Sequence, residues 1–167
     1  KLYQIKQRSP KKPIAVFVND LKMAKKFLNF NDWEDKIARN FMPGMITLVL
    51  EKKGNKDHKI FISPLLNCND NSLGLRIPSH KFCLELLKNF NGVIAATSAN
   101  LSDKDSAISC EQTKIYFPNG VDLIIDGGIC QHKVASTVLK VKNNKIVILR
   151  EGLITKDQIN NFYEQNS

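Results

Sequence analysis

Short apolar runs alternate with amphipathic stretches along the first hundred residues. A short apolar run predicts a strand, whereas apolar residues three or four apart predict a helix with one buried face. The last two runs follow one another without a helix between them, which predicts a hairpin. The predicted strands are 14–18, 45–51, 72–78, 93–98, 121–126, 134–141 and 145–150, and the predicted helices are 21–28, 31–41, 79–90, 109–117 and one that opens at Thr155.

Polar residues mark the ends of several of these elements. Asp20 and Ser79 each precede an amphipathic stretch, where a short polar side chain caps a helix. Asn31 lies three residues before Glu34, which is the spacing of a capping box. The asparagine pair at 143–144 tolerates positive φ and predicts a tight hairpin turn between the last two strands.

Strands that alternate with helices early and pair as a hairpin late are typical of a mixed α/β domain. We expect one domain over residues 1–167, with a twisted mixed sheet flanked by helices, because this length suits a single core. The first residues, LYQIKQR, resemble the last turns of a helix without its beginning. We therefore expect the domain to be truncated at its amino terminus.

Hydropathy and cysteine usage point to a cytoplasmic protein without a membrane partner. No apolar run approaches the roughly 20 residues of a membrane-spanning helix, and the first residues lack the apolar part of a signal peptide. The cysteines show no CxxC pair and are predicted to be buried thiols, and the scattered histidines predict no metal site. These residues are Cys68, Cys83, Cys110 and Cys130, and His58, His80 and His132.

Positive charge is concentrated in the first third of the chain. The sequence has 25 Lys and Arg against 16 Asp and Glu, a net charge of +9, and residues 1–60 alone carry 14 basic and 6 acidic side chains. Such an excess favours an anionic partner, either RNA or a polyphosphate nucleotide. A solvated basic face without a partner would give the same composition.

The sequence contains no GxxxxGK[ST], HExxH or GxSxG motif. Their absence excludes P-loop nucleotide hydrolases, zinc proteases of the HExxH type and hydrolases of the GxSxG type. Thr97, Ser98 and Asn100 instead follow the apolar part of the predicted strand, VIAA at 93–96, and strand ends in open α/β sheets are where ligands bind. Ser136, Thr137 and Arg150 lie in or at the end of late strands, and basic residues cluster before Pro13. Together they predict an anion pocket, although each could serve only its own loop.

Six segments occur in a fixed order across nearly the whole chain: KQRSPKKPIAVFV, MPGMITLVL, GLRIPSH, ATSANLS, ASTVLKV and ILREG. In combination they resemble the threonylcarbamoyl-AMP synthases with the YrdC-like fold. The leading Pro-Thr-x-Thr-x-Tyr-Gly-Leu element of that family does not occur here, and Phe17 stands where many members have His.

The resemblance implies a nucleotidyltransferase that makes L-threonylcarbamoyladenylate from L-threonine, bicarbonate and ATP with Mg²⁺, and releases pyrophosphate. A downstream tRNA threonylcarbamoyl transferase complex would use the product to modify adenosine 37 of tRNA. The alternative is a non-catalytic YrdC-like module that binds double-stranded RNA or tRNA through a basic concave surface. The resemblance implies catalytic roles for Lys6, Arg8, Ser98 and Asn100, substrate or nucleotide contacts for Arg76, Ser106, Ser136 and Arg150, and no metal ligands.

Overall fold

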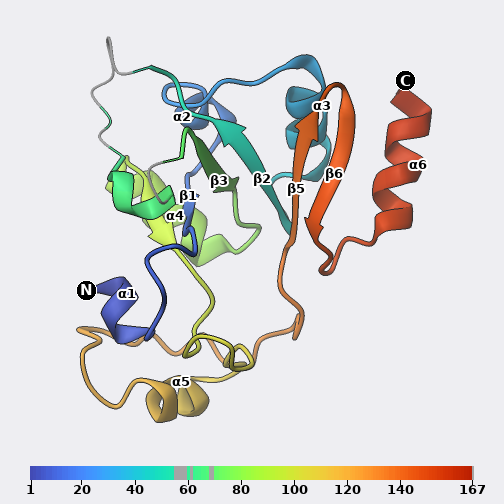
Figure 1. Cartoon of the computed structure of the whole chain (residues 1–167). Helices are drawn as coiled ribbons and strands as arrows, with labels where there is room; N and C mark the ends of the chain where they lie inside the picture. Colours follow the sequence, from blue (N-terminus) through green and yellow to red (C-terminus); the bar gives the residue numbers. More distant parts are fainter. Residues whose placement is uncertain (55–59, 61, 68–69, 167) are drawn as a thin grey trace.

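The computed structural model describes residues 1–54, 60, 62–67 and 70–166. Among them, strands form one mixed sheet in the order β4-β1-β3-β2-β5-β6 (Figure 1). The β1–β3 and β2–β5 pairs are parallel and the other pairs are antiparallel, as expected for a mixed sheet. The strands are β1 Ala15–Phe17, β2 Ile46–Glu51, β3 Ser72–Arg76, β4 Ile94–Ala96, β5 Thr137–Lys142 and β6 Lys145–Arg150.

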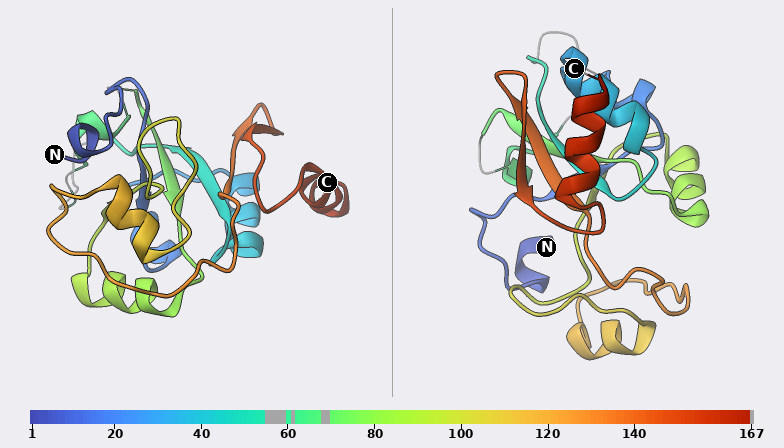
Figure 2. Two further views of the ribbon diagram at one scale, coloured as in Figure 1. Left: turned by 90° about the horizontal axis from the view of Figure 1, so that it is seen from below. Right: turned by 90° about the vertical axis from the view of Figure 1, so that its right-hand side faces the viewer.

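Helices surround this sheet. The long carboxyl-terminal helix lies beside the β5–β6 hairpin in both views of Figure 2. It also packs on the third helix, where the rings of Tyr163 and Trp33 stack with centroids 4.6 Å apart. The helices are α1 Leu2–Ile5, α2 Leu21–Ala24, α3 Asp32–Phe41, α4 Lys81–Phe90, α5 Cys110–Tyr116 and α6 Lys156–Asn166, and a 3-10 turn spans Pro64–Asn67.

One face of the sheet forms the hydrophobic core. Val16, Leu48, Leu75 and Leu139 are paired in register across the central strands and are fully buried. They belong to one apolar cluster with residues of α2 and α3, which lie behind the sheet in Figure 1. Burial of these side chains is the main stabilising term of the fold.

The other face carries small and polar side chains, because neighbours in a strand point to opposite sides. Ala15 and Phe17 flank the buried Val16, and both are only half-buried. A Cβ atom on Gly74 would lie 3.2 Å from Ala15 Cβ and 3.3 Å from Thr47 Cγ2. Gly74 therefore lets β1, β2 and β3 pack closely on the face opposite the core, where a larger side chain would be crowded.

The predicted cap at Asp20 is confirmed, because its Oδ1 accepts the N–H of Met23 at 2.7 Å. The helix itself is shorter than predicted and ends at Ala24 rather than residue 28. Leu28 forms an isolated bridge with Lys52 instead. Because Leu28 pairs with Lys52 as an extended residue, the end of the apolar stretch cannot form a further helical turn.

The capping box of α3 is confirmed, with Asn31 Oδ1 accepting from Glu34 N–H at 2.9 Å and the Glu34 carboxylate accepting from Asn31 N–H at 2.8 Å. The predicted Ser79 cap is wrong. The first hydrogen bond of α4 runs from the N–H of Leu84 to the carbonyl of His80, so His80 occupies the N-cap position, and it does so without a side-chain cap.

Two predicted strands differ from the structure. The run at 121–126 forms no strand in the described chain, and Leu123 and Ile125 are exposed, because an apolar run becomes a strand only where a partner strand is available. The run at 93–98 forms only the three-residue β4, and it lies at the edge of the sheet. Among the described residues β4 pairs with β1 alone, and Ala95 is exposed rather than buried.

The prediction of buried thiols is wrong for Cys130, which is exposed, while Cys83 and Cys110 are half-buried. Cys130 lies in an irregular connection that contributes no strand to cover it. Cys68 and His58 lie outside the described residues, as do residues 59 and 61 of KIFIS, a short apolar run at 59–63. No described helix is long and apolar enough to cross a membrane.

Candidate active site

Lys6 organises the loop at 98–100. Its side chain is 2% exposed, and its Nζ donates to the carbonyl of Ser98, the carbonyl of Asn100 at 2.6 Å and Asn100 Oδ1 at 2.8 Å. A lysine ammonium has three N–H donors, so all of them are used by this loop. The charge of Lys6 therefore holds the loop in place and has no donor left for a ligand.

Ser98 and Asn100 complete this cluster. The Ser98 hydroxyl donates to Asn100 Oδ1 at 2.7 Å, and Asn100 Nδ2 donates to the carbonyl of Lys104. The N–H of Ser102 donates to the carbonyl of Lys6 at 2.9 Å, which ties the loop back to the start of the chain. The structure thus joins three predicted site residues in one hydrogen-bond network. Lys6 is 92 positions from Ser98 and 94 positions from Asn100 in the sequence.

Arg8 lies beside this network and does not join it. Its Nε donates to the carbonyl of Lys12 at 3.3 Å and its Nη2 to the carbonyl of Pro13 at 2.9 Å. A guanidinium carries five N–H donors, so others remain for an anion. Arg8 is close enough to Lys6 for its charge to disfavour the protonated ammonium.

Burial, with a smaller contribution from the charge of Arg8, lowers the pKa of Lys6 from 10.5 to about 8. Below this pH the ammonium supplies three donors, and above it the neutral amine supplies two. We predict that the amide signals of Asn100 and Ser102 shift in NMR spectra with a midpoint near the pKa of about 8. The Lys6→Met variant should lack this transition. Flat shifts between about pH 7 and 9.5 in the unsubstituted protein would contradict this role of Lys6.

A second cluster lies on the open face of the sheet. Thr47 and Ser136 are buried, and their hydroxyl oxygens are 2.8 Å apart. Arg150 Nη2 donates to the Ser136 carbonyl at 2.8 Å and approaches its hydroxyl oxygen at 3.4 Å. The parallel pairing of β2 with β5 brings Thr47 and Ser136 together, so the hydroxyl pair is a product of sheet register.

Arg76 extends this cluster along the same face. Its Nε donates to the carbonyl of Gly44 at 2.9 Å, and its guanidinium lies 5.5 Å from the ring centre of Phe17. Burial lowers the pKa of Arg76, the nearby Cys83 opposes this shift, and the charge of Arg150 adds to it. Two guanidinium groups that affect one another create a positive potential suited to a bound anion.

Ser106 lines a cleft of about 560 Å³ between the loop at 104–108 and the chain before β5. Ala135 and Glu151 form the other wall, and they are the chain neighbours of Ser136 and Arg150. The cleft therefore places Ser106 next to the second cluster. The described residues contain no group of three His, Cys, Asp or Glu side chains able to hold a metal ion.

Comparison with known proteins identifies the family of this chain. The family model of Sua5, YciO and YrdC, which carries the description telomere recombination, matches residues 1–152. The chain belongs to the Sua5/YciO/YrdC family. The resemblance inferred from the six ordered segments is thereby confirmed.

Members of the Sua5/YciO/YrdC family are similar over most of this chain. A relative from Methanocaldococcus jannaschii is 33% identical over 92% of this chain and 69% of its own length. The threonylcarbamoyl-AMP synthase of Bacillus subtilis is 32% identical over 95% of this chain and 45% of its own length. The structure of Pyrococcus abyssi Sua5 complexed with L-threonine superposes with a TM-score of 0.88 at 26% identity, covering 96% of this chain and 46% of that one. The chain thus spans about half the length of the last two proteins.

Sequence reasoning assigned Thr47 no role in this candidate site, whereas it placed Thr137 with Ser136 in the predicted anion pocket. Thr47 bonds Ser136, and Thr137 Oγ1 accepts from the N–H of Gly152 at 2.9 Å and donates to the carbonyl of Ile154 at 2.5 Å. The available signal was a hydroxyl residue inside an otherwise apolar strand, which needs a hydrogen-bond partner when buried.

Gly152 fixes the distance between β6 and the start of β5. A Cβ atom there would lie 2.2 Å from the carbonyl oxygen of Ala135 and 2.6 Å from the carbonyl carbon of Ser136. We predict that Gly152→Ala lowers the free energy of unfolding by about 1–3 kcal/mol, as overpacking does. Urea denaturation measures this change. Gly127→Ala is the matched control, because among the described residues no atom beyond its two chain neighbours lies within 4 Å of that added Cβ. An equal loss in both variants would contradict the prediction.

Proposed function

We propose that this protein makes L-threonylcarbamoyladenylate from L-threonine, bicarbonate and ATP, and releases pyrophosphate. The observation that carries the proposal is the pair Arg76 and Arg150, with the Ser136 hydroxyl, on an open sheet face in a chain of this family. The likeness to Pyrococcus abyssi Sua5, whose structure contains L-threonine, supports the same reaction class.

The residues fit a reaction that depends on positioning and charge. The threonine amine attacks the bicarbonate carbon and water is lost, which gives a carbamate. A carbamate oxygen then attacks the α-phosphorus of ATP, the bond between this phosphorus and the bridging oxygen to the β-phosphate breaks, and pyrophosphate leaves. The protein has to orient two anions and stabilise charge on phosphate oxygens, for which cationic and hydroxyl donors suffice. Arg8 and Arg150 would bind phosphate oxygens, Arg76 would pair with the threonine carboxylate, and Ser106 and Ser136 would donate to substrate oxygens.

Lys6, Ser98 and Asn100 would form the wall that positions the nucleotide. Since the three Lys6 donors all go to the loop, we assign Lys6 a positioning role rather than direct contact with phosphate. The Ser98 side chain is exposed and lies at the surface of this wall. The loop is thus a preorganised support of the kind that nucleotidyl transfer requires.

Mg²⁺ would enter this site as a counterion of ATP. The candidate residues are cations, hydroxyls and one amide, whereas a magnesium ion held by protein prefers carboxylate oxygens. The phosphates of ATP would therefore supply the ligands, and the ion would neutralise their charge. The reaction would take place in the cytoplasm, where a downstream tRNA threonylcarbamoyl transferase complex would consume the adenylate.

Mass spectrometry with ¹³C-labelled bicarbonate tests this proposal. The protein, L-threonine, ATP, Mg²⁺ and labelled bicarbonate should yield the adenylate with one added mass unit, because one carbonyl carbon comes from bicarbonate. Samples that lack any one substrate should contain none of the product. Absence of the labelled adenylate from the complete mixture would overturn the proposal.

A further inference from the structure

Thr137 adjoins the second cluster of the candidate active site but points to the other face of the sheet. It follows Ser136 at the start of β5, and neighbours in a strand point to opposite faces. Its partner in the parallel pair with β2 is the core residue Ile46, and its own side chain is fully buried. Thr137 therefore points into the core and contributes no group to an anion pocket on the open face.

The Thr137 hydroxyl is bonded to the connection between β6 and α6, residues 151–155. Its Oγ1 accepts from the N–H of Gly152 at 2.9 Å and donates to the carbonyl of Ile154 at 2.5 Å, so its single hydrogen is used. Between these two bonds, the N–H of Leu153 donates to the carbonyl of Ala135 at 3.0 Å. The connection is thus tied to residues 135–137 at three successive positions.

A β-bulge just before this connection sets the direction of Arg150. Ile148 pairs with Leu139, but Arg150 pairs with Val138, so β6 has one extra residue between them. In continuous register Arg150 would lie opposite Thr137 on the core side. The shift by one residue places it opposite Val138 and therefore on the open face of the sheet.

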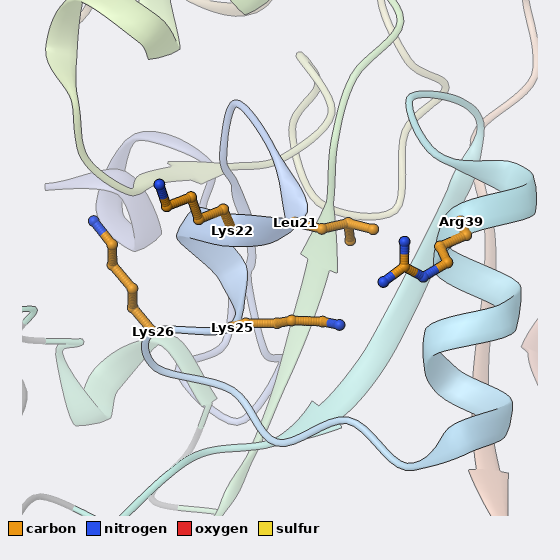
Figure 3. A pocket seen from close by; sticks show the side chains of 5 residues that line it. All are labelled: Leu21, Lys22, Lys25, Lys26 and Arg39. Carbon is orange, nitrogen blue, oxygen red and sulfur yellow. The ribbon is translucent and has the colours of Figure 1, made fainter.

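Arg150 is exposed, and a backbone carbonyl holds it: its Nη2 donates to the carbonyl of Ser136 at 2.8 Å. Arg39 of α3 is exposed as well, but it pairs with the Asp35 carboxylate at 2.7 Å, and Figure 3 shows it turned toward Lys25. Within the described part of the chain, no carboxylate forms an ion pair with Arg150. The bond to a carbonyl thus directs the Arg150 guanidinium without neutralising its charge, which leaves that charge for a bound phosphate.

We propose that Thr137 is a positioning residue that keeps Arg150 and Ser136 oriented toward the phosphates of ATP. The inference rests on the proposed function, in which Arg150 binds phosphate oxygens and Ser136 donates to substrate oxygens. Without the hydroxyl, residues 151–155 lose two of their three bonds to residues 135–137, and the Arg150 side chain samples more directions. An arginine that samples more directions binds an anion less tightly, because binding then has to order it.

Thr137→Val tests this role because it removes the hydroxyl and keeps the branched shape of the side chain. We expect kcat/KM for ATP to fall by about tenfold or more, since a small displacement of a binding group lowers the rate strongly. The KM for L-threonine should stay unchanged, because Arg76 is held by Gly44 and Met45 and not by residues 151–155. Thr137→Ser keeps the hydroxyl and should restore most of kcat/KM.

Hydrogen exchange of the Gly152 amide, measured by NMR, reports the same geometry without any substrate. It should be at least about tenfold faster in Thr137→Val than in the unsubstituted protein, and nearly unchanged in Thr137→Ser. Ile37→Val removes a methyl group at a fully buried position of α3 and is the control for a fold that is only less stable. Thr137→Ala also lacks the hydroxyl and leaves space for the freed groups, so it repeats the test if valine prevents folding.

The positioning role would be overturned by an unchanged kcat/KM for ATP in Thr137→Val, or by an equal loss in Ile37→Val. A loss in Thr137→Val without faster exchange of the Gly152 amide would overturn it as well. In each of these cases the unsubstituted protein still makes the adenylate, so the proposed function stands. Absence of adenylate from the unsubstituted protein would instead overturn the proposed function, and the role of Thr137 with it.

Discussion

Replacing Asn100 with alanine is expected to lower the rate of adenylate formation by about a hundredfold or more. Asn100 Oδ1 accepts from both Lys6 and Ser98, and its Nδ2 donates to the carbonyl of Lys104. Alanine removes all three bonds, so the loop at 98–100 loses its fixed geometry. A misplaced loop lowers the rate because the activation barrier of nucleotidyl transfer depends on donors that are positioned before the reaction.

The fold should tolerate the Asn100→Ala change, because the side chain is only half-buried and lies outside the apolar cluster. We expect a melting temperature within a few degrees of the unsubstituted protein. Asn160→Ala is the matched control, since Asn160 is exposed on α6. Equal rates for the Asn100 and Asn160 variants would show that the loop geometry does not contribute to catalysis.

Replacing Arg76 with methionine is expected to reduce kcat/KM for L-threonine by about 10–100-fold, which corresponds to the about 1.5–3 kcal/mol of a hydrogen bond to a charged group. Two donors of Arg76 are used by Gly44 and Met45, so its position is fixed while other N–H groups remain for a carboxylate. Steady-state kinetics with threonine and ATP varied separately measure the effect.

The pattern of change identifies what Arg76 binds. The loss should appear in the KM for threonine, and Arg76→Lys should restore only part of it, because an ammonium cannot form the paired bonds of a guanidinium. Lys145→Met, at an exposed position of β6, is the control for loss of one positive charge. A rise confined to the KM for ATP would contradict the assignment of Arg76 to the threonine carboxylate.

Local patterns predicted the elements whose stability is set locally. The capping box at Asn31 and Glu34 was predictable because both partners lie within one helical turn. The left-handed turn at 143–144 was predictable for the same reason, with φ of 50° and 59°. The run at 121–126 was not, because its apolar residues are compatible with a strand only when another strand is adjacent.

In the candidate site, too, the sequence predicted which residues take part, but not the contacts between residues that are far apart in the chain. The short segments identified Lys6, Ser98 and Asn100 as related, but sequence could not reveal that all Lys6 donors turn toward the loop, since the partners are 92 and 94 positions away. The bond between Thr47 and Ser136 depends on the register of β2 against β5, which is fixed only when the sheet assembles.

Pyrophosphate release, measured with each substrate omitted in turn, tests the proposed function most directly. Adenylate formation requires that one pyrophosphate leaves for each carbamate that attacks ATP. We predict release only when L-threonine, bicarbonate and ATP are present together, and in a one-to-one ratio with the adenylate. Steady ATP turnover without threonine, or no release in the complete mixture, would contradict the account.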